Sequence, residues 1–147
     1  MLIGQYKVNV GLKKRIAAPK KFREELGDKL IITRGFEECL VIVNEKAWLD
    51  ITSDVSTAPY GLAEMREVSR FLVGGAAEVE LDSQGRFVIP DNLLEYAGIN
   101  SEVLFIGLMR WVEIWDKSKW EAKDLSTRKS NKADAQALSE RFSPISK

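Results

Sequence analysis

The sequence predicts an α+β fold, rich in β-strands and with short helices, in which two copies of one unit form a single pseudo-two-fold domain. Residues 6–48 and residues 77–120 present the same order of features at an offset of 71 to 72 residues. Each copy has an alternating run, a turn ending in arginine, a proline four residues later, a short helical pattern that stops at glycine, and two apolar runs leading to tryptophan. A unit this short cannot bury its own apolar face well, so the two copies are expected to complete one another.

Charge is distributed unevenly along the 147 residues, although the formal net charge is zero. The first 23 residues hold seven Lys or Arg and no Asp or Glu, whereas residues 24–125 carry ten basic and twenty acidic residues. Residues 126–147 are again basic, with five basic and two acidic residues. A zero total by itself argues against a nucleic-acid binder, but the local field decides what a surface attracts. The basic N-terminal segment therefore favours an anionic partner.

The first copy is assigned to residues 5–48. Its helix is expected to begin at Pro19, which suits the first helical position, and to stop at Gly27. Phe22 and Leu26 share one face of that helix. The other expected elements are a half-buried strand at 4–10, a basic turn at 13–15, an extended stretch at 15–18, hairpin strands at 30–34 and 40–43, and a helical turn at 46–51.

A linker and connecting helix, residues 49–75, separate the copies. Residues 53–61 have linker composition, and residues 62–73 show helical spacing that ends at a Gly-Gly pair. The second copy, residues 76–120, repeats the order strand, turn, strand, helix and two strands. Residues 121–147 form a polar, basic tail that is expected to be loosely held from 126 onward, with a possible helix at 133–142.

Catalytic chemistry has little support in the sequence. There is no histidine, which removes the commonest general base and metal ligand. The single cysteine, Cys39, is more typical of a core residue than of a nucleophile, and it suits a reducing compartment. No apolar run reaches membrane-spanning length. We expect no catalytic residues, metal, cofactor, small-molecule substrate or membrane partner, and a cytoplasmic location.

The turns carry the functional signal. In residues 82–86, Gly85 can adopt positive φ and Asp82 can cap the turn, so that Arg86 is presented from a rigid tip. Taken alone, the motif is a tight hairpin with an exposed arginine. Arg15 occupies the same place in the other copy, and two arginines shown from rigid turns can bridge a DNA groove through their bidentate side chains.

The cations around Arg15 complete the candidate DNA-binding set. Their alternative interpretation is a solvated face, but seven bases without one acid favour phosphate contact. Arg86 either assists in binding or buttresses its own turn. The remaining candidates are Lys7, Lys13, Lys14, Lys20, Lys21 and Arg23.

The motifs FREELGDKLIITRGFEECL, GGAAEVELDSQGRFVIP, LLEYAGI and VEIWDKSKWE resemble the MraZ family, whose members contain two SpoVT-AbrB-type motifs. The resemblance covers nearly everything from residue 4 to residue 121. It implies a swapped-hairpin fold with the two half-motifs pairing inside one chain, and ring-like homo-oligomers. It further implies sequence-specific binding of double-stranded promoter DNA at short direct repeats upstream of the division and cell-wall gene cluster, usually as a repressor in the nucleoid.

The first turn departs from the family pattern Asp-x-x-Gly-Arg. Gly11 stands in the aspartate place and Lys14 in the glycine place. Lys14 would therefore need a positive φ, unless Gly11 relaxes the turn elsewhere. The first turn is more basic than the family pattern, and Arg15 is retained.

These observations favour an oligomeric DNA-binding transcriptional regulator without enzymatic activity. The first alternative is a protein-interaction module of antitoxin-like fold, whose basic N-terminus binds an acidic protein. A small hydrolase with paired carboxylates ranks far lower, because nothing in the sequence indicates the required pocket.

Overall fold

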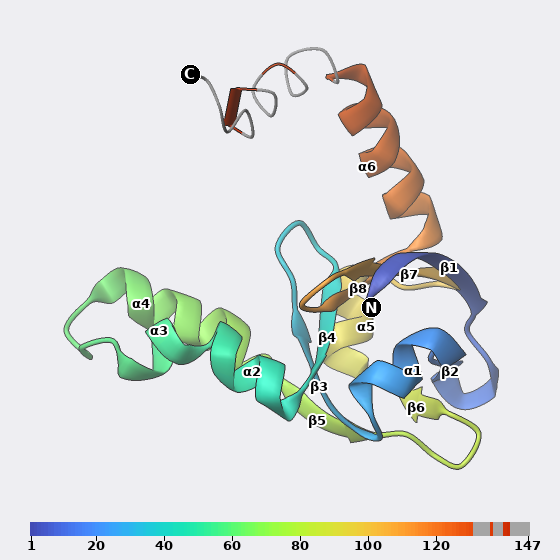
Figure 1. The fold of residues 1–147 in the computed structure, drawn as a ribbon, viewed down its shortest axis with the longest axis horizontal. Helices are drawn as coiled ribbons and strands as arrows, with labels where there is room; N and C mark the ends of the chain where they lie inside the picture. The colour runs from blue at the N-terminus through green and yellow to red at the C-terminus, as the bar shows by residue number, and fades with distance from the viewer. Residues whose placement is uncertain (131–135, 137–139, 142–147) are drawn as a thin grey trace. The chain divides into compact units, whose positions relative to one another are not determined.

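The computed structural model describes residues 1–130, 136, 140 and 141. The chain divides into two compact units, residues 1–117 and residues 118–147, and the first unit holds every strand of both copies. Its fold is α+β and β-rich, as the sequence predicts (Figure 1). None of the helices in the described residues is both long enough and apolar enough to cross a membrane.

One antiparallel sheet contains strands of both copies, and every neighbouring pair of strands except β7–β8 and β4–β3 joins one copy to the other. Exchanging the copies turns β1 into β5, β3 into β7 and β4 into β8. The exchanged order is the same order of strands, counted from the opposite edge of the sheet. This is the pseudo-two-fold arrangement expected from the repeat. The order across the sheet is β1 (Ile3–Asn9), β7 (Glu102–Leu108), β8 (Val112–Asp116), β4 (Leu40–Asn44), β3 (Lys29–Arg34) and β5 (Ala77–Glu80).

Each copy gives its first strand to the other copy. β1 pairs with β7, where Tyr6 lies opposite Phe105, and β5 pairs with β3, where Ala77 lies opposite Ile32. Those two pairs occupy equivalent places in the repeat. A second, two-stranded sheet also joins the copies, because β2 (Arg15–Ala17) pairs with β6 (Arg86–Val88). The swapped-hairpin prediction is therefore confirmed.

One core serves both copies. The helices α1 (Lys20–Leu26) and α5 (Asp91–Ala97) each bury one face. Phe22 of α1 and Leu93 of α5 belong to the same buried cluster as the inward side chains of the strands. Pro19 lies one residue outside α1 in the N-cap position, so the helix starts one residue later than predicted.

The connecting segment is more helical than its composition indicates. Asn44 caps α2 (Glu45–Ile51) by accepting a hydrogen bond from the Ala47 N–H at 2.8 Å. The expected linker begins with a helix, α3 (Ser53–Thr57), because the hydroxyls of Ser56 and Thr57 bond back to the preceding turn rather than breaking it. The predicted helix over residues 62–73 forms as α4 (Ala63–Val68) and a π-helical turn, η2 (Ser69–Val73).

Beyond the repeat, α6 (Lys117–Lys129) extends past residue 126, where the sequence suggested that a loosely held tail would begin. The possible helix at 133–142 lies mostly outside the described residues.

Candidate nucleic-acid interface

The two-stranded sheet β2–β6 presents both repeat arginines on one face. Ile16 and Phe87 point inward and are 0% and 3% exposed. Because side chains alternate along a strand, the neighbouring residues point the other way. We call this outward surface the ribbon face, and it consists of Arg15, Ala17, Arg86 and Val88.

The two arginines lie diagonally across the ribbon. Arg15 is opposite Val88, and Arg86 is opposite Ala17. Diagonal neighbours of this kind are about 7–8 Å apart along the backbone. Both arginines line one shallow groove of about 380 Å³, which they share with Glu78, Glu80 and Asp82.

The second turn is closed by Asp82. Its Oδ1 accepts hydrogen bonds from the N–H groups of Gln84 at 2.8 Å and Arg86 at 2.9 Å. Its Oδ2 accepts a bond from Nε of Arg86 at 3.0 Å. The Arg86 N–H, with help from that of Gln84 and the Arg86 guanidinium, lowers the pKa of the Asp82 carboxyl from its ordinary value. Gly85 supplies the positive φ of 76° that the turn requires.

The first turn, which contains η1 (Leu12–Lys14), keeps the same backbone bonds without the cap. Gly11 N–H donates to Arg15 O at 2.8 Å, the distance found between Asp82 and Arg86. Lys13 and Lys14 have φ values of 57° and 61°, whereas Gly11 is extended with φ −85°. The suggestion that Gly11 relaxes the turn is therefore wrong, because the lysines themselves adopt the left-handed conformation.

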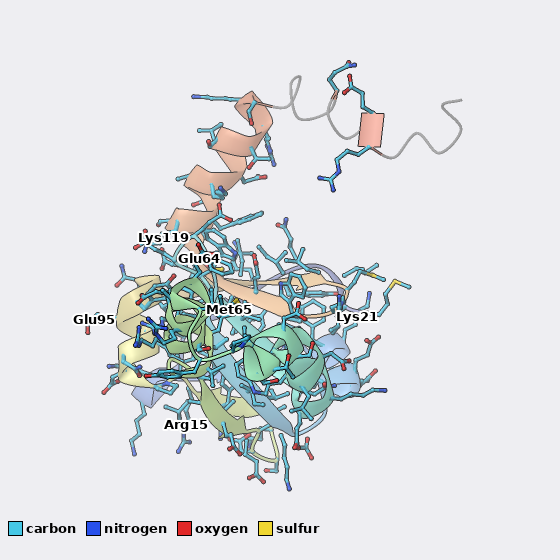
Figure 2. The ribbon with its side chains drawn as sticks, turned by 90° about the vertical axis from the view of Figure 1, so that its left-hand side faces the viewer. Arg15, Lys21, Glu64, Met65, Glu95 and Lys119 are labelled. Atoms are coloured by element: carbon cyan, nitrogen blue, oxygen red, sulfur yellow. The ribbon has the colours of Figure 1, made fainter. Side chains whose placement is uncertain are left out.

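Arg15 is the exposed cation of this face. Within the part of the chain that the structure describes, its guanidinium has no hydrogen-bond or ion-pair partner. It projects away from the ribbon toward solvent (Figure 2). Lys13, two residues earlier, is also exposed. The first turn therefore presents two exposed cations, Lys13 and Arg15, to solvent.

Each turn is tied to the helix of the other copy. Lys14 Nζ forms an ion pair of 3.1 Å with Asp91 at the start of α5. Arg23 of α1 donates from Nη1 to Gln84 O at 3.1 Å, and its guanidinium occupies the space that a side chain at Gly85 would need. Arg23 Nε is buried without a partner among the described residues. Arg23 thus braces the second turn.

The other candidate lysines are exposed but spread more widely. Lys7 lies on β1, and Lys20 and Lys21 lie at the start of α1. Figure 2 shows Lys21 at a different edge of the molecule from Arg15. The structure therefore gathers Arg15 and Arg86 in one groove, places Lys13 and Lys14 in the turn next to Arg15, and leaves Lys21 apart from Arg15. The contacts that sequence reasoning missed are those of Lys14 and Arg23, whose partners are 77 and 61 residues away.

Cys39 has the properties predicted for a core residue. It is 0% exposed, and Sγ donates to Phe36 O at 3.2 Å. Burial, together with the negative charges of Glu113 and Glu37, raises the pKa of this thiol to about 12. The thiol is therefore protonated at neutral pH. Among the described residues there is no group of three or more Cys, Asp or Glu side chains that could hold a metal ion.

Together, the exchanged strands and arginine-bearing turns define a duplicated swapped-hairpin protein of the SpoVT-AbrB type. The MraZ protein family (antitoxin-like) matches the chain twice, at residues 1–71 and 72–142. The chain belongs to the MraZ family.

Three similar proteins are each named transcriptional regulator MraZ. The chain is 44% identical over 122 residues to the transcriptional regulator MraZ of Acetivibrio thermocellus, which covers 83% of this chain and 85% of that protein. It is 47% identical over 120 residues to the transcriptional regulator MraZ of Caldicellulosiruptor bescii, covering 82% and 84%. The transcriptional regulator MraZ of Thermoanaerobacter pseudethanolicus is 41% identical over 140 residues, covering 95% and 98%.

Proposed function

We propose that this protein is a DNA-binding transcriptional regulator without enzymatic activity, acting in the cytoplasm at the nucleoid. The observation that carries the proposal is the exposed Arg15, which has no partner among the described residues and lies beside Lys13 at the end of a two-stranded antiparallel ribbon. A ribbon of this kind fits the major groove of B-DNA, and arginine forms a bidentate contact with guanine or phosphate. The name shared by the similar proteins supports a role in transcription.

The proposed roles follow from the placement of each residue. Arg15 contacts base edges, and Lys13 and Lys14 contact phosphates. The ion pair between Lys14 and Asp91 is exposed and weak, so a DNA phosphate can replace Asp91 as the partner of Lys14. Lys7, Lys20 and Lys21 add to the attractive field. Arg23 and Arg86 brace the second turn rather than contacting DNA.

The proposed target is a set of short direct repeats in the promoter of the division and cell-wall gene cluster, with repression as the outcome. Residues 5–48 and 76–120 are the two SpoVT-AbrB-like motifs, residues 49–75 connect them, and residues 121–147 form the tail. A ring-like homo-oligomer would present several first turns to repeated sites. Linked contacts then raise the overall affinity without any strong single contact.

The test is a mobility-shift titration of the protein against its own upstream DNA and a scrambled duplex, over a series of salt concentrations. The protein should prefer the upstream DNA, and its affinity should fall steeply with salt. Arg15→Ala should remove the preference. Arg110→Ala is the matched control, because Arg110 is also exposed but lies between β7 and β8. Normal promoter affinity in Arg15→Ala would overturn the assignment, and absence of any binding would favour an acidic protein partner.

A further inference from the structure

The pseudo-two-fold symmetry of the backbone is not matched by the charges on it. Along the first copy, the strand β1 and the turn after it carry Lys7, Asn9, Gly11 and Arg15. At the same places, 71 residues later, the second copy carries Glu78, Glu80, Asp82 and Arg86. With Lys13 and Lys14 included, the first segment has four cations and no acid, and the second has three acids and one cation.

We infer that each chain contacts DNA with its first turn alone, because Asp82 holds Arg86 against the second turn, whereas Gly11 offers no carboxylate to Arg15, which has no partner among the described residues. The inference rests on the proposed function and adds to it a division of labour between the copies. It makes Gly11 and Asp82 the residues that decide which end of the ribbon binds.

Asp82 acts on Arg86 in two ways. Its Oδ2 holds Nε at 3.0 Å, which fixes the guanidinium against its own turn. Its charge also cancels that of the arginine at the place where a phosphate would approach. Both groups are about 40% exposed, so the ion pair is available to solvent, and a phosphate would have to compete with a carboxylate already in contact.

Glu78 and Glu80 extend the same effect along β5. Both are exposed, and both line the groove that contains the two arginines. A phosphate moving from Arg15 toward Arg86 would meet three carboxylates. The negative charges of the phosphate and of these carboxylates would repel one another. The acidic end of the ribbon thus keeps Arg86 from contacting phosphate. It also determines which end of the ribbon faces the DNA.

Gly11 has the opposite consequence. The Gly11 N–H donates to Arg15 O at 2.8 Å, and the Asp82 N–H donates to Arg86 O at the same distance. A carboxylate at position 11 would therefore be able to reach the Arg15 guanidinium, as that of Asp82 reaches Arg86. A Cβ at Gly11 would lie 3.1 Å from Arg15 O, a close contact that a small shift of the turn would relieve. Glycine at this position therefore removes the carboxylate while the backbone bond to Arg15 O is kept.

The first experiment measures promoter affinity for Arg86→Ala, Gly11→Asp and Gly11→Asn, with wild type and Arg15→Ala alongside. Arg86→Ala should change the affinity less than about twofold, whereas Gly11→Asp should weaken it about fivefold or more, as expected for loss of one bidentate contact. Gly11→Asn can cap the turn without the charge and should bind more tightly than Gly11→Asp. Both Gly11 variants should melt at or above the wild-type temperature, which separates loss of binding from loss of folding.

The second experiment gives positions 78, 80 and 82 the charges of positions 7, 9 and 11, with Glu78→Lys, Glu80→Asn and Asp82→Asn combined. Asparagine at position 82 keeps the Oδ1 acceptor that caps the turn. Affinity should rise about threefold or more with a steeper salt dependence, and Arg86→Ala should now weaken binding. Equal losses from Arg86→Ala and Arg15→Ala in the wild-type background, or no effect of Gly11→Asp, would overturn the inference. Failure of the wild type to bind DNA would instead overturn the proposed function.

Discussion

Among single residues, the two lysines of the first turn adopt an unfavourable backbone conformation. Lys13 and Lys14 both have positive φ, where the second turn uses Gly85. The left-handed conformation costs a side-chain-bearing residue about 1–2 kcal/mol, because Cβ approaches the following carbonyl. Lys14 recovers little through its exposed ion pair with Asp91. Positive charge beside Arg15 is therefore retained at a cost in stability.

Lys14→Gly should be more stable than Lys14→Ala by about 1 kcal/mol in urea unfolding. Both variants lose the ion pair with Asp91, so the difference between them isolates the backbone term. Lys20 provides the control, since it begins α1 with helical geometry and glycine there should be no better than alanine. Equal stability of the two Lys14 variants would show that the turn opens to avoid the left-handed conformation.

At the scale of elements, Arg34 holds the π-helical turn η2 against β3. Its Nε and Nη2 donate to the carbonyls of Phe71 and Arg70, each at 3.0 Å, and its guanidinium lies 4.8 Å from the Phe71 ring centroid. The wide turn is visible in the bond from Gly74 N–H to Ser69 O, five residues back. One side chain thus satisfies carbonyls at the end of the connecting segment.

Arg34→Lys should loosen this contact, because lysine cannot make two directed bonds and stack at once. We expect faster amide exchange at residues 69–74 and a loss of about 1–2 kcal/mol in unfolding free energy. Arg66→Lys is a matched control, since Arg66 makes one bond to Tyr60 O and lies over the Tyr60 ring. It should leave exchange at 69–74 unchanged, and equal effects of the two substitutions would contradict the role of Arg34.

At the scale of the whole molecule, the copies are joined by strand exchange rather than by docking of finished units. β1, β2 and β3 all pair with strands of the second copy, and β4 pairs with β8. Neither copy closes its own sheet. The apolar cluster likewise draws on both copies, so separation would expose it.

Residues 1–75 or residues 76–147 alone should therefore not fold as monomers. Each fragment should lack a cooperative thermal transition or self-associate in place of its missing partner, and mixing the two should restore a cooperative transition. Circular dichroism melting with light scattering checks both outcomes. A monomeric fragment that unfolds cooperatively would contradict the dependence on exchange.

Local patterns in the sequence predict most of the secondary structure. The hairpin around residues 35–38 and the helix containing Phe22 follow from periodicity and turn residues, which act over a few positions. The helix α3 was not predicted, because Ser and Thr favour loops by composition but bond to preceding carbonyls here. The candidate site divides in the same way. The pattern points to Arg15 and Asp82, whereas the engagement of Arg23 with Gln84 O crosses 61 residues.

The repeat, the absence of histidine and the basic N-terminal segment are properties of the sequence itself, and they determine the β-rich pseudo-two-fold class and favour an anionic partner. The placement of both arginines on one face is decided only by the tertiary structure, because β2 and β6 come from different copies. The tertiary structure also decides which other cations are engaged: Arg23 bonds to Gln84 O and Lys14 pairs with Asp91, across 61 and 77 residues. The physical reason is that local turn residues fix a contact such as Asp82–Arg86, whereas contacts between the copies form only when folding brings distant segments together.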